Sequence, residues 1–148
     1  MPAEIEAVLA TAVDALQEVL GTMFFSDAVP VACRHDAEND WISARVRFRG
    51  APAGEMRLTL SANLAAVLAA GFLGIDESEV TGEAGGQVIC ELANMICGAI
   101  LSRLHPDSLV ALSAPELAPV DFGRPGGIHR CFAIPEGTVA IELSSDAW

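Results

Sequence analysis

Four residues at helical spacing, Gln87, Glu91, Asn94 and Gly98, carry the polar chemistry of an otherwise apolar segment. Because an α-helix advances about 100° per residue, these four and Ser102 lie within a sector of about 80°. A second sector holds apolar side chains and is predicted to face the core: Val88, Leu92, Met95, Ile96 and Ala99.

This polar stripe differs from an ordinary solvated helix face, which carries Lys and Glu in pairs one turn apart. It holds one carboxylate, two amides that can each accept a hydrogen bond from water while donating another, a glycine and a small hydroxyl. Gly98 lies one turn after Asn94 and leaves room for another backbone or side chain to approach. The plainer alternative stays open: Glu and Asn are common on helix faces, and a glycine can simply permit close packing.

Hydrophobic periodicity predicts the elements that position the stripe. The predicted elements are a helix at 3–20 ended by Gly21, a hairpin at 41–50 and 55–61, a helix at 62–73 between Ser61 and Gly74, a helix from 80 or 81 to 104 that is regular from about Gln87, a strand at 109–112, an irregular segment at 115–127, and a hairpin at 130–134 and 138–143. Segregated helices on one face of a mostly antiparallel sheet make an α+β fold, in one domain spanning residues 1–148.

In the first hairpin, alternation places Arg45, Arg47 and Arg49 on one face and the apolar side chains on the other. We expect Phe48 opposite Met56 and Val46 opposite Leu58. The arginines indicate a solvated sheet face, or alternatively a contact with an acidic partner or a dimer mate.

The segment Glu91-Leu92-Ala93-Asn94-Met95-Ile96-Cys97-Gly98 resembles the ExxN signature, with its trailing glycine, of the CheC/CheX/FliY phosphatases. The order of predicted elements resembles CheX over nearly the whole chain, as does the opening stretch at 15–23. Gln87 stands where the family usually has Asp or Ser. Pro115 comes about two residues earlier than the family's later proline.

The resemblance implies a phosphatase that accelerates hydrolysis of the aspartyl phosphate of a CheY-like response regulator. Asn94 would position the attacking water, and Glu91 would contact the regulator's active-site lysine; Gln87 and Gly98 would lie at the partner contact. The chain would need no cofactor, because the divalent cation (Mg) belongs to the regulator. Relatives also imply a homodimer. The departures at Gln87 and Pro115 favour an alternative, a catalytically silent module that binds a response regulator or signalling partner.

Composition narrows the classes of function and of partner that remain possible for the chain. With 20 acidic and 8 basic residues and a net charge of −12, the chain lacks the clustered cations that bind nucleic acid or anionic lipid. The acidic N-terminus and the absence of a long uncharged stretch predict a cytoplasmic protein. The three histidines and four cysteines form no zinc-binding spacing. We expect the cysteines to be reduced, small apolar residues of the core.

Overall fold

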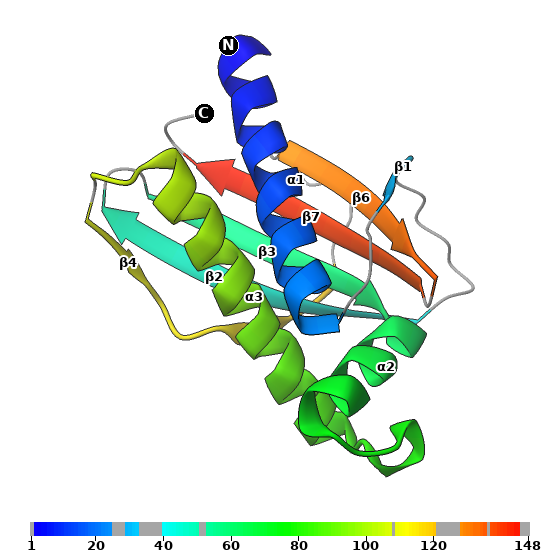
Figure 1. Ribbon diagram of the computed structural model, residues 1–148. Helices are drawn as coiled ribbons and strands as arrows, with labels where there is room; N and C mark the ends of the chain where they lie inside the picture. The colour runs from blue at the N-terminus through cyan, green and yellow to red at the C-terminus, as the bar shows by residue number, and fades with distance from the viewer. Residues whose placement is uncertain are drawn as a thin grey trace.

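A single antiparallel sheet forms the centre of the molecule (Figure 1). The computed structural model describes residues 2–24, 29–32, 40–50, 53–107, 109–120, 128–135 and 137–145. The seven strands are β1 (Val29–Val31), β2 (Trp41–Gly50), β3 (Gly54–Ser61), β4 (Val110–Leu112), β5 (Glu116–Ala118), β6 (Ile128–Ile134) and β7 (Gly137–Ser145). Their order is β1-β6-β7-β3-β2-β4, and β5 also pairs with β2.

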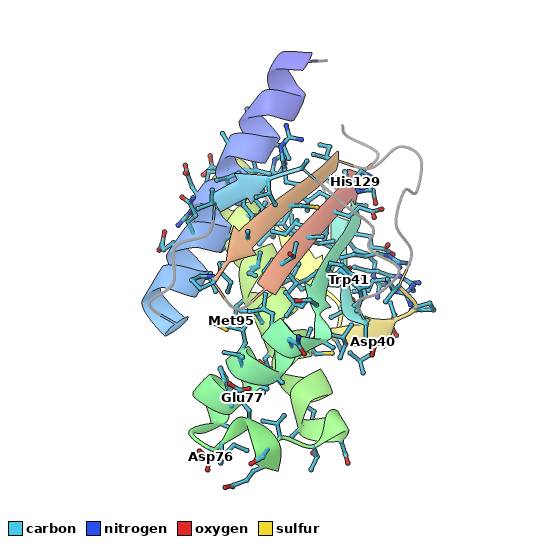
Figure 2. All side chains as sticks on the ribbon, turned by 90° about the vertical axis from the view of Figure 1, so that its right-hand side faces the viewer. Asp40, Trp41, Asp76, Glu77, Met95 and His129 are labelled. Atoms are coloured by element: carbon cyan, nitrogen blue, oxygen red, sulfur yellow. The ribbon has the colours of Figure 1, made fainter. Side chains whose placement is uncertain are left out.

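Three helices pack against one face of this sheet: α1 (Pro2–Phe24), α2 (Ala62–Leu73) and α3 (Gly82–Leu104). Figure 1 shows α1 and α3 side by side across the sheet, with α2 at one end. A short 3₁₀ turn, η1 (Glu77–Glu79), joins α2 to α3, and Figure 2 shows Asp76 and Glu77 at the tip of this connection, away from the sheet. The predicted α+β class, with helices on one face of an antiparallel sheet, is confirmed.

The core lies between the sheet and the helices. Fully buried side chains reach it from each layer, including Leu16 of α1, Leu64 of α2, Ile96 of α3 and Phe48 of β2. Burying one such side chain contributes about 1.5–3 kcal/mol, so the face of each element is set by its apolar residues.

One predicted helix boundary is wrong. The first helix continues through Gly21 to Phe24, because one interior glycine costs only about 1 kcal/mol and packing of the helix outweighs it. The predicted start of the long helix at residue 80 or 81 is confirmed to within two residues, because α3 begins at Gly82 and the Thr81 hydroxyl caps its first turn by accepting a hydrogen bond from the Ala84 N–H at 3.1 Å. The helix is regular from Gly82 onward and not only from about Gln87. The predicted end of α2 is confirmed, with Gly74 in the left-handed region at φ 69°.

The predicted register of the first hairpin is shifted by two residues. Val46 lies opposite Met56, and Phe48 lies opposite Gly54. A shift of two keeps every side chain on its face, so apolar alternation cannot detect it. Gly54 fits this register: a Cβ there would collide with the Ser144 carbonyl oxygen of β7 and lie 2.8 Å from Phe48 Cζ, so the glycine leaves space for the neighbouring strand and for the ring.

Helix α3 is long and apolar enough to cross a membrane by length and composition. Half of that apolar window is buried inside the domain, which is the property of a core helix. Nine of its residues are buried: Gly86, Val88, Ile89, Leu92, Ala93, Ile96, Cys97, Ile100 and Leu101. The prediction that Met95 faces the core is wrong, because its side chain lies at the border of the buried sector and is 39% exposed.

The cysteines divide into two kinds. Cys90 and Cys97 are free, as expected. The prediction of a reduced thiol is wrong for Cys131, which is disulfide-bonded; Cys33 lies outside the described residues. The pairing of β1 with β6 places Val31 opposite Cys131. Spacing along the sequence does not reveal that these two strands are neighbours.

Candidate functional site

The polar stripe of α3 faces outward, as its periodicity predicts. Gln87 and Glu91 are exposed, and Asn94 and Gly98 are half-buried. Glu91 and Asn94 lie about one helical turn apart, roughly 4.5 Å along the axis. Because the other faces of α3 pack in the core, the helix holds this carboxylate and amide on a rigid support.

The polar groups of the stripe are available to a partner. Within the described part of the chain, the side chains of Gln87, Glu91 and Asn94 form no hydrogen bond or ion pair. Ser102 differs, because its hydroxyl donates to the Ala99 carbonyl of the same helix at 3.1 Å. The three side chains therefore keep their full hydrogen-bonding capacity for a molecule that docks on α3.

A groove of about 670 Å³ runs beside the stripe, between the first half of α3 and the segment that contains β5. Figure 1 shows this segment in yellow, passing behind α3 after β4. The lining residues are Glu83, Gly86, Gln87, Cys90, Glu91, Pro115, Glu116 and Leu117. The fold thus brings Pro115 to the same groove as Gln87 and Glu91, although 24 residues separate Pro115 from Glu91 in the sequence.

Strand β5 is the part of this groove that sequence patterns missed. Residues 115–127 are predicted to be irregular, yet Glu116–Ala118 pair with β2. Three residues are too short for a period of two to be recognised, and the neighbouring prolines hide the strand. Residues 121–127 of that predicted segment lie outside the described residues.

A second hollow of about 190 Å³ lies at the other end of the stripe, between the end of α3 and β4. Gly98 and Ser102 line it from α3, and Leu112 lines it from β4. A Cβ built on Gly98 would lie 3.8 Å from Leu112 Cδ1, an ordinary van der Waals distance. Among the described residues, packing therefore does not require a glycine at position 98.

The two free cysteines of α3 are poor nucleophiles. Burial, together with the nearby carboxylates of Glu91 and Glu116, raises the pKa of Cys90. Burial raises the pKa of Cys97 to about 12. Both thiols are therefore protonated at neutral pH, and neither is an activated nucleophile.

Metal ligands do not gather at this site. Among the residues that the structure describes, no group of three or more His, Cys, Asp or Glu side chains is placed to hold a metal ion. The stripe offers one carboxylate, of Glu91, and two side-chain amides, of Gln87 and Asn94.

Comparisons with known proteins agree with the fold and with the family that the sequence resembles. A family model described as "Chemotaxis phosphatase CheX" matches residues 42–119, just over half of the chain, and includes α3. No curated protein sequence matches the chain.

Solved structures share the fold at low sequence identity. A chemotaxis protein CheX from Desulfovibrio desulfuricans superposes with a TM-score of 0.75 at 18% identity, covering 95% of this chain and 99% of that chain. CheX from Vibrio vulnificus has a TM-score of 0.73 at 20% identity, with coverage of 95% and 99%. The CheX-CheY-BeF3-Mg²⁺ complex from Borrelia burgdorferi has a TM-score of 0.70 at 15% identity, with coverage of 93% and 96%.

Proposed function

Because the chain belongs to the CheX family of chemotaxis phosphatases, we propose that it accelerates hydrolysis of the aspartyl phosphate of a CheY-like response regulator. The observation that carries the proposal is the exposed Glu91 and half-exposed Asn94, both without partners in the described chain, on a helix whose other faces are buried. The complex of the Borrelia burgdorferi relative with CheY supports the class of partner.

We assign to Asn94 the positioning of the water that attacks the phosphorus. Response regulators already hydrolyse their aspartyl phosphate slowly, so a phosphatase needs only to hold a water in line with the phosphorus. Positioning of this kind can supply several kcal/mol. An amide oxygen accepts a hydrogen bond from the water while the amide nitrogen donates to the phosphoryl group, as a glutamine orients water in GTPases.

We assign to Glu91 the contact with the active-site lysine of the regulator. A carboxylate one turn before the amide can form an ion pair with that ammonium group and so fix the register in which the two proteins dock. The cation that neutralises the phosphoryl group is supplied by the regulator, and this chain contributes no metal ligand to the step.

Release of inorganic phosphate from a phosphorylated cognate regulator tests the proposal. We expect Asn94→Ala to reduce the accelerated rate at least about 100-fold without lowering the melting temperature, because the amide has no partner in the described chain and alanine is the better helix former. Glu91→Ala should raise KM and lower kcat together. Ser102→Ala is the matched control, since its hydroxyl bonds only its own helix. Wild-type protein without any acceleration would end the enzymatic proposal.

A second candidate function is a silent module that binds a regulator without turnover. Gln87 favours it, because this exposed and unpartnered amide stands where the family usually has Asp or Ser. Titration calorimetry with a regulator held in its active form by beryllofluoride separates the two candidates. A silent module binds the regulator and leaves its dephosphorylation rate unchanged, whereas a phosphatase binds it and raises the rate.

We also propose a homodimer formed through a sheet edge. Strand β1 pairs with β6 on one side, and its Val29 and Val31 are 58% and 40% exposed. An exposed apolar edge strand is a template for pairing with another chain. Light scattering during size-exclusion chromatography measures the mass directly, and Val31→Lys should shift a dimer to the monomer.

The proposed reaction places the protein in the cytoplasm with its response regulator.

A further inference from the structure

On the inner, helix-facing side of the sheet, β5 contacts α3 through Leu117, whose side chain is 53% exposed. Leu117 lies opposite Ala44 of β2, whose side chain is buried in the core, so both point toward the helices. There Leu117 meets Gly86 of α3: a Cβ on that glycine would lie 2.9 Å from Leu117 Cδ1. The missing side chain at Gly86 thus sets how closely β5 approaches the start of the polar stripe.

On the outer face of the sheet, charged side chains hold the same strand. Glu116 lies opposite Arg45, and its Oε1 accepts hydrogen bonds from Arg45 Nε at 3.0 Å and Nη2 at 2.5 Å. Next along the segment, Arg57 of β3 donates from Nη1 to the Pro119 carbonyl at 3.1 Å. The segment is therefore fixed from both faces of the sheet.

The two arginines are themselves opposite one another, as Arg45 pairs with Arg57 in the β2–β3 ladder. Like charges in that position are unfavourable. Glu55 offsets the repulsion, with Oε2 3.0 Å from Arg57 Nε and Oε1 4.0 Å from Arg45 Nε. An arrangement that places two cations together indicates that their fixed orientation matters, and what they orient is the segment from Glu116 to Pro119.

We infer that Arg45 and Arg57 are positioning residues: from the sheet face opposite the helices, they fix the β5 wall of the groove at the distance from Glu91 that a docked regulator requires. The inference rests on the proposed function. Neither arginine touches the regulator. Their effect reaches the site through Glu116 and Pro119, while α3 keeps Asn94 in place through its own buried residues.

Kinetics of phosphate release distinguish positioning from a general loss of stability. We expect Arg45→Met to raise KM about fivefold with kcat within about twofold, since an ion pair with one half-exposed partner is worth about a factor of five. Arg45→Lys should restore much of the KM because an ammonium can still reach Glu116. Arg47→Met is the matched control: it lies on the same strand and face, contacts Glu55 at 3.7 Å, and its side chain makes no contact with Glu116.

Hydrogen exchange tests whether Arg45 holds β5 in place, and this measurement requires no enzymatic activity. In Arg45→Met, the amides of residues 116–118 should exchange at least about tenfold faster than in Arg47→Met, while those of α3 stay protected. Equal exchange of residues 116–118 in both variants overturns the inference, as does an equal KM in an active phosphatase. A wild-type protein that releases no phosphate but shows the exchange difference would instead refute the proposed function and leave the anchoring of β5 standing.

Discussion

Replacing Gly98 by alanine separates the needs of the fold from the needs of the proposed partner. Gly98 is in the interior of α3 and half-exposed, and its added Cβ would lie 3.8 Å from Leu112 Cδ1 without a closer contact. The methyl group therefore fits. In a helix interior alanine is more favourable than glycine by about 0.8–1.0 kcal/mol, because glycine loses more backbone freedom on folding.

The free energy of unfolding should rise by about that amount. For a chain of 148 residues this corresponds to an increase in melting temperature of roughly 2–4 °C. Urea unfolding followed by circular dichroism measures the change, and the slope m should stay constant since the buried surface hardly changes.

Activity should move in the opposite direction. The same methyl group stands one turn after Asn94 on the outward stripe, where the regulator has to approach, so we expect kcat/KM for phosphate release to fall at least about tenfold. Gly85→Ala is the control, because its Cβ would lie 3.5 Å from Val80 Cγ1 and it lies away from the stripe. It should stabilise α3 and leave phosphate release unchanged.

Two results would refute this reasoning. A Gly98→Ala variant that is less stable than the wild type would mean that the fold itself requires the glycine. A variant that is more stable and equally active would mean that the regulator does not dock over this part of α3.

The remaining predictions concern the residues that bury and cap α3. Burial raises the pKa of Cys97 to about 12, so the free energy of unfolding should decrease as the pH rises from about 9 toward 12, where the unfolded chain loses the proton first. Cys97→Ala should reduce that decline in urea titrations, because the chain has no Tyr or Lys that titrates there. Thr81→Ala should destabilise the protein by about 1 kcal/mol through loss of the cap on Ala84 N, measured by calorimetry. Ile96→Ala, at a fully buried position, should cost about 2–5 kcal/mol in urea unfolding; a cost below about 1 kcal/mol would show that the core is loosely packed there.

Local patterns predicted most of the elements because each depends on neighbours in the sequence. Alternation in β2 and β3 placed Val46 and Met56 on the buried face, and the αL glycine at Gly74 ended α2. The same patterns misplaced the hairpin register by two residues, since the fit of Phe48 over Gly54 is a contact between strands. They also predicted a solvated sheet face for the arginines. Instead, Arg45 donates a hydrogen bond to Glu116, which lies 71 residues further along the chain.

The stripe of Gln87, Glu91, Asn94 and Gly98 was determined by the sequence alone, because the pitch of one helix decides which of its residues share a face. The groove beside it was decided only by tertiary structure. Pairing of β5 with β2 and the contact of Leu117 with Gly86 bring Pro115 to Glu91, and such pairings depend on long-range packing that no periodicity along the chain encodes.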